Sequence, residues 1–89
     1  MVHVFISGRV QGIGFRQFIK SKANRLNLRG WVRNLPDGRV EGMFAGERKN
    51  IEEILDYCRK GPFLADVRKI EVDWNSKIKV DTMEFEIIQ

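Results

Sequence analysis

The chain carries the stretch Gly8-Arg9-Val10-Gln11-Gly12-Ile13-Gly14-Phe15-Arg16 between an apolar strand pattern and a helical pattern. Glycines permit turns in which consecutive backbone N–H groups point at one spot, and the N-terminus of a following helix adds a partial positive charge. A loop of this kind is suited to an anion, and phosphate fits it best. Arg16 would add a forked, permanently charged group at the same place.

Five strand-like and two helical segments follow from the apolar periodicity on either side of this loop. The predicted strands cover residues 2–6, 30–34, 40–45, 70–74 and 83–87, and the predicted helices begin at Phe15 and Ile51. Their order is the split βαβ pattern of ferredoxin-like folds, with a short final strand at an edge. The sequence therefore predicts an α+β, two-layer sandwich in which two helices cover one face of an antiparallel sheet.

The connections carry turn and cap signals. Leu35-Pro36-Asp37-Gly38 is typical of a tight type I turn, so the strands on either side should form a hairpin. Asn50 is expected to cap the second helix, with Glu53 three residues later, and Gly61-Pro62 to end it. If the first strand lies centrally, the glycine loop and Asn34, at the end of the second strand, should meet at one edge of the sheet.

Composition indicates one small soluble domain spanning residues 1–89, with 43% hydrophobic and 31% charged residues. No apolar run approaches the ~18 residues of a membrane span, and the first residues resemble a strand rather than a signal peptide. The single cysteine, Cys58, cannot form an internal disulfide and is expected in the core. We therefore expect a cytoplasmic monomer without a membrane partner.

Charge is unevenly distributed along the chain. Residues 1–40 hold eight Lys/Arg and a single acid, Asp37, whereas residues 41–89 hold eight Lys/Arg and eleven acids. The positive half coincides with the glycine loop, where its field favours a small anion. A merely solvated basic surface is the other interpretation of the same pattern.

Several phosphate-handling sites are excluded by spacing. The loop lacks the third glycine of a dinucleotide site, since position 17 is Gln17, and lacks the Lys-Ser/Thr pair of a nucleotide P-loop. Cys58 stands in a helix without a phosphate loop ending in arginine, so it is no phosphatase nucleophile. His, Cys and carboxylates show no metal-ligand spacing, and we expect neither a metal nor a cofactor.

The scarcity of acids near the loop favours one class of phosphate compound over another. A phosphate monoester expels a poor alkoxide and usually needs an acid or a metal. An acyl phosphate expels a carboxylate, whose conjugate acid has a pKa near ~4, so its departure needs no proton. Positioning and stabilisation of the phosphoryl charge can then suffice.

Two motifs resemble the acylphosphatase family: Gly8 to Arg16, and Gly30-Trp31-Val32-Arg33-Asn34 followed by Gly38, Val40 and Gly46. The resemblance implies a ferredoxin-like fold and hydrolysis of small acyl phosphates to carboxylate and inorganic phosphate, without metal, cofactor or phosphoenzyme. It implies that Arg16 binds the phosphate and that Asn34 orients the attacking water. The backbone N–H groups implied to bind phosphate are those of Gln11, Gly12, Ile13, Gly14, Phe15 and Arg16.

Two other functions compete with this interpretation. A basic ferredoxin-like domain could bind RNA, and Arg29-Gly30-Trp31 resembles the opening of an RNA-recognition strand. Val32-Arg33-Asn34 then lacks the small residue and the later aromatic needed to stack bases, so we expect no nucleic-acid partner. The chain could also be an acylphosphatase-like docking or regulatory unit, although both implied catalytic side chains are present.

Overall fold

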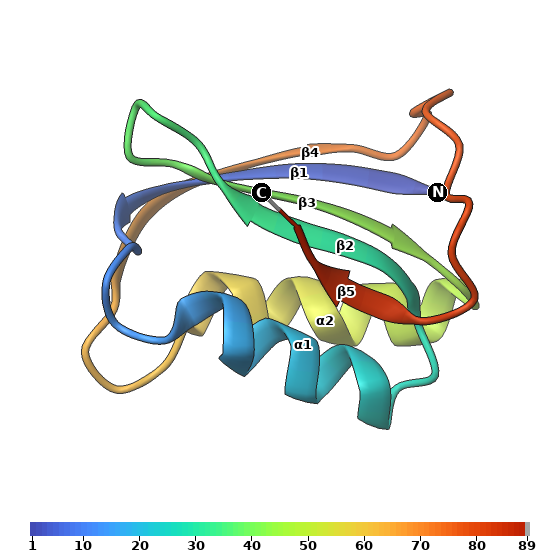
Figure 1. Ribbon diagram of the computed structural model, residues 1–89, viewed down its shortest axis with the longest axis horizontal. Coiled ribbons are helices and arrows are strands. Elements are labelled where there is room, and N and C mark those ends of the chain that lie inside the picture. The colour runs from blue at the N-terminus through green and yellow to red at the C-terminus, as the bar shows by residue number, and fades with distance from the viewer. Residues whose placement is uncertain (89) are drawn as a thin grey trace.

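A computed structural model describes residues 1–88 and contains the predicted order of elements (Figure 1). Two helices cover one face of a five-stranded sheet whose strand order is β4-β1-β3-β2-β5. The two-layer α+β sandwich predicted from the sequence is therefore confirmed. The elements are β1 (Val2–Arg9), α1 (Phe15–Arg25), β2 (Arg29–Asn34), β3 (Val40–Ala45), α2 (Arg48–Lys60), β4 (Asp66–Asp73) and β5 (Phe85–Ile87).

The sheet is mixed, which corrects the prediction of a wholly antiparallel sheet. The pairs β1–β3, β1–β4 and β2–β3 are antiparallel, but β5 pairs with β2 in parallel, with Gly30 opposite Phe85 and Val32 opposite Ile87. After β4, the chain crosses one end of the sheet and reaches the opposite edge, as Figure 1 shows. Because β5 starts at the end of the sheet where β4 stops, it runs opposite to β4 and in the same direction as β1 and β2, so its pairing with β2 is parallel.

The core lies between the sheet and the two helices. Val2, Val4 and Ile6 alternate along β1 and are at most 1% exposed, so one face of the strand is buried. Phe15 and Ile19 stand four residues apart on α1 and are equally buried, which turns that side of the helix toward the sheet. On α2 the buried residues are Ile51, Ile54, Leu55 and Cys58, so the predicted burial of the cysteine is confirmed.

The second helix begins earlier than predicted. It starts at Arg48, with Glu47 as the preceding residue, and Asn50 lies inside its first turn, so the prediction that Asn50 caps it is wrong. Arg48 and Lys49 are exposed, so the first turn carries none of the apolar periodicity on which the prediction relied. The other end is as predicted, because Gly61 follows Lys60 and terminates the helix.

The predicted hairpin joins β2 to β3 through residues 35–39. The N–H of Gly38 donates to the carbonyl of Leu35 at 3.1 Å, and the N–H of Leu35 donates to the carbonyl of Arg39 at 2.8 Å. Asp37 accepts the N–H of Arg39 at 3.1 Å and its Nε at 2.8 Å, and the backbone bond is the main cause that holds the pKa of Asp37 below its usual range. These bonds close the hairpin one residue after Asn34.

Candidate active site

The glycine loop leads from β1 into α1 and takes a conformation that suits glycine. Gly12 has φ 77° and Gly14 has φ 79°, both in the left-handed region that side chains disfavour. Gly14 immediately precedes α1, and its carbonyl accepts the N–H of Phe18 at 3.0 Å. Arg16 is the second residue of this helix, and the first turn contains no acid. The first turn therefore presents backbone N–H groups and one arginine at the positive end of the helix.

Strand directions bring Asn34 to the same end of the sheet. Because β1 and β2 each run antiparallel to β3, which lies between them, β1 and β2 run in the same direction. Their carboxyl ends, which precede the glycine loop and the hairpin loop respectively, therefore lie at one edge. The meeting of loop and strand end expected from the sequence is found, although β2 is not the direct neighbour of β1.

A pocket of about 360 Å³ occupies this edge and contains both Arg16 and Asn34. It is formed by the loop, the first turn of α1, the end of β2 and one residue of β5. None of its described lining residues is acidic. The lining residues are Val10, Gly12, Gly14, Phe15, Arg16, Gln17, Asn34 and Ile87.

The side chain of Asn34, which lines this pocket, has an unsatisfied acceptor. Its Oδ1 is buried and has no hydrogen-bond partner, the one such side-chain atom in the part of the chain that the structure describes. A buried polar atom left without a partner costs about 1–3 kcal/mol, so such atoms are uncommon in folded proteins. A water molecule or a ligand in the pocket would satisfy it.

Two of the residues predicted at the site do not line this pocket. Ile13 is partly buried against the hydrophobic core, and the side chain of Gln11 turns toward the hairpin, where its Nε2 donates to the carbonyls of Leu35 and Arg39. The binding role expected for their backbone N–H groups stays a prediction. Phe15 lines the pocket and is 1% exposed, so it supports the loop from the core.

Two lining residues, Gln17 and Ile87, were not predicted from the sequence. Gln17 directly follows Arg16 in the helix, where the motif ends. Ile87 reaches the pocket because β5 pairs in parallel with β2. No local pattern foretold that pairing, since residues 74–84 between β4 and β5 form neither helix nor strand.

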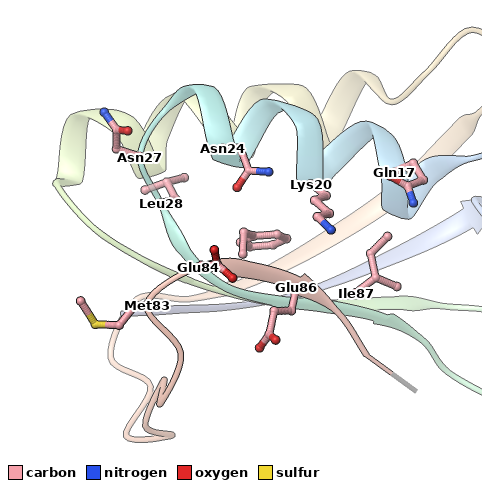
Figure 2. Close-up of a pocket in the computed structure, with 10 residues that line it drawn as sticks. Gln17, Lys20, Asn24, Asn27, Leu28, Met83, Glu84, Glu86 and Ile87 are labelled. Carbon is pink, nitrogen blue, oxygen red and sulfur yellow. The ribbon is translucent and has the colours of Figure 1, made fainter.

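A polar groove of about 830 Å³ adjoins the pocket and shares Gln17 and Ile87 with it. It runs between α1 and β5, as Figure 2 shows. Lys20 and Asn24 reach into it from the helix, whereas the carboxylate of Glu86 points away from the helix. The small pocket therefore opens beside a larger space in which the rest of a substrate could lie.

The other face of the sheet anchors the strand that carries Asn34. Glu41 is 6% exposed. Its carboxylate accepts the Nε of Arg33 at 2.6 Å and bonds the Nε2 of His3 at 2.6 Å. His3, the sole histidine of the sequence, is thus engaged away from the pocket. Because Arg33 directly precedes Asn34, this ion pair fixes the last residues of β2.

No group of three or more His, Cys, Asp or Glu side chains within residues 1–88 is placed to hold a metal ion. Neither described helix has the length and apolar character needed to cross a bilayer.

Comparison with known proteins identifies the family. An acylphosphatase family model matches residues 2–87. The acylphosphatase of Chloroflexus aurantiacus is 49% identical over 72 residues, covering 81% of this chain and 78% of that protein. The crystal structure of acylphosphatase from Bacillus subtilis superposes with a TM-score of 0.92 at 32% identity, covering 99% of this chain and 97% of that one. HypF of T. kodakarensis also matches, at 32% identity and a TM-score of 0.82, over 99% of this chain and 12% of its own. On the family model and on this identity, the chain belongs to the acylphosphatase family.

Proposed function

We propose that this protein hydrolyses the carboxyl–phosphate bond of small acyl phosphates by direct attack of water, without a metal or cofactor. One observation carries the proposal: Arg16 and Asn34 line the same small pocket, and the Oδ1 of Asn34 is buried without a hydrogen-bond partner. Family membership supports the same reaction. The products are a carboxylate and inorganic phosphate.

The glycine loop and the start of α1 bind the phosphate. The backbone N–H groups of residues 11–16 and the helix N-terminus offer partial positive charge, and Arg16 offers two parallel donors to phosphoryl oxygens. Because a phosphoryl group carries its charge on its peripheral oxygens in the transition state, these donors stabilise the transition state as well as the bound substrate.

Asn34 orients the attacking water. Its Oδ1 accepts a hydrogen bond from the attacking water, which fixes a lone pair of the water oxygen toward phosphorus. The oxygen–phosphorus bond forms while the bond from phosphorus to the acyl oxygen breaks, and its electron pair leaves with the carboxylate. The water's protons end on phosphate and solvent.

Proton donation to the leaving group is unnecessary, and the residues around the pocket agree with this. A carboxylate leaves as the anion of an acid with a pKa near ~4. Asp37, the single acid among residues 1–40, lies exposed in the hairpin loop and is bonded to Arg39. Orientation and charge stabilisation therefore supply the catalysis.

The monomeric state and the cytoplasmic location belong to this proposal. Residues of one chain complete the pocket, so no second copy is needed to form it. Cys58 is a buried free thiol, which suits a reducing compartment. We also propose that neither nucleic acid nor a membrane is a partner.

The deciding experiment measures benzoyl phosphate hydrolysis in excess EDTA for the wild type, Asn34→Ala and Asn75→Ala. Asn75 is an exposed asparagine in the turn after β4, so it serves as the matched control. We expect metal-free turnover in the wild type and control, and a kcat about 10²–10³-fold lower in Asn34→Ala. Inhibition by inorganic phosphate should be preserved, because Arg16 and the loop remain.

Other outcomes point to other functions. Near-normal turnover in Asn34→Ala would refute the role of that residue. A folded wild type without turnover would refute hydrolysis and favour a docking unit, as the match to one part of HypF allows. Titration with RNA would then test nucleic-acid binding, which should weaken steeply with salt.

A further inference from the structure

The side chain of Gln11 joins the two loops that make the pocket. Its Nε2 donates to the carbonyl of Leu35 at 2.8 Å and to the carbonyl of Arg39 at 2.9 Å. Gln11 belongs to the glycine loop, whereas Leu35 and Arg39 are the first and last residues of the hairpin loop. The two hydrogens of one amide group therefore link segments that are 24 and 28 residues apart in the sequence.

The hairpin does not need this amide to close. The carbonyl of Leu35 already accepts the N–H of Gly38, and the carbonyl of Arg39 already accepts the N–H of Leu35. A carbonyl oxygen has two lone pairs, so Gln11 takes the second position on each. Removing its amide leaves both carbonyls bonded and the turn closed. What is lost is the connection between the hairpin and the glycine loop.

Asn34 directly precedes this junction. On one side, Arg33 is held by Glu41 at 2.6 Å. On the other side, Leu35 is held by Gln11 at 2.8 Å. The backbone on both sides of Asn34 is thus fixed, and the Gln11 bonds fix it relative to the loop that leads to Arg16.

We propose that Gln11 is a positioning residue, whose side-chain amide sets the distance between Asn34 and the phosphate held at Arg16. The inference rests on the proposed hydrolysis. In-line attack requires the water and the phosphoryl group to be aligned, and a misplacement of 1 Å can lower a rate about 10²-fold. The amide acts through Asn34 and does not touch the substrate, which separates its role from that of the backbone N–H of the same residue.

The test replaces Gln11 with methionine, which has similar length and no donor, and compares it with Asp37→Asn. Asp37 also bonds the hairpin loop, but only from within it, so its variant is the matched control. In Gln11→Met we expect kcat for benzoyl phosphate to fall about 10- to 100-fold. KM and inhibition by phosphate should stay within about twofold, since the backbone loop and Arg16 are unchanged. Asp37→Asn should keep the wild-type kcat.

A double variant separates positioning from general loosening. If Gln11 acts through Asn34, Gln11→Met should lower kcat in the wild type but not lower the residual kcat of Asn34→Ala further. A merely structural role predicts equal losses in both backgrounds. Equal losses, or an unchanged kcat in folded Gln11→Met, would overturn the inference.

Hydrogen exchange gives a second measurement that does not depend on folding of the variant. Both side-chain amide hydrogens of Gln11 should exchange slowly in the wild type, because both are bonded to carbonyls. Rapid exchange of either hydrogen would overturn the inference. Wild-type turnover lost in Asn34→Ala would still uphold the proposed function in that case, whereas an inactive wild type would refute the proposed function itself.

Discussion

Replacing Gly14 with alanine should separate the function of the glycine loop from its contribution to stability. Gly14 has φ 79°, and a Cβ built there meets no atom within 4 Å, so the cost is backbone strain alone. A non-glycine residue in this region costs about 1–2 kcal/mol. Gly38, in the hairpin loop, has φ 97° and equally open surroundings, so Gly38→Ala is a control with similar strain outside the pocket lining.

The two variants should therefore lose similar stability. For a domain of this size, 1 kcal/mol corresponds to about 4–8 °C in Tm, so each should melt about 4–16 °C below the wild type. A domain stable by roughly 5–15 kcal/mol remains folded after such a loss.

Activity should distinguish them. The N–H of Phe15, which follows Gly14, belongs to the proposed phosphate site, and relaxation of the strain in Gly14→Ala should rotate it out of its binding position. A hydrogen bond to a charged group contributes about 1.5–3 kcal/mol, which is roughly 10- to 150-fold in affinity. We expect phosphate to inhibit Gly14→Ala that much more weakly in the benzoyl phosphate assay, and Gly38→Ala as in the wild type. Wild-type inhibition of Gly14→Ala, or equal weakening in both variants, would refute the assignment of phosphate to this loop.

Two further predictions concern Arg16 and Cys58. Arg16→Ala should lower kcat/KM for benzoyl phosphate by at least about 10²–10³-fold and weaken inhibition by phosphate. The control Arg25→Ala, at the exposed end of the same helix, should change neither quantity. Near-normal turnover in Arg16→Ala would contradict the role assigned to that residue. Burial raises the pKa of the Cys58 thiol from 9.0 to about 12, so the unfolded chain releases this proton at lower pH than the folded one. The thiol of Cys58 should therefore contribute its full stabilising free energy below pH 9. Between pH 9 and 12 the free energy of unfolding should fall by up to about 1.4 kcal/mol per pH unit. Urea unfolding of Cys58→Ala should show a shallower alkaline decline than the wild type, and parallel declines would contradict the prediction.

The predictable part of this fold is the part governed by local patterns. Alternation along β1, helical spacing after Phe15 and the turn at residues 35–38 each depend on neighbouring residues, and the structure agrees with them. The start of α2 was misplaced because its exposed first turn has no apolar pattern. The parallel pairing of β5 was missed for another reason. A three-residue strand has little periodicity of its own, and its partner lies more than 50 residues earlier in the chain.

The same distinction governs the site. The proximity of Arg16 and Asn34 could be predicted from the sequence, because a split βαβ order makes the first two strands run in the same direction. Side-chain direction could not be foreseen. Gln11 was expected to contribute a backbone N–H, yet its amide reaches carbonyls 24 and 28 residues away. A sequence motif records which residues a loop contains, but not which neighbouring loop their side chains will meet. Those contacts depend on the packing of the two loops, and in the proposed mechanism that packing sets how Asn34 faces a phosphate bound at Arg16.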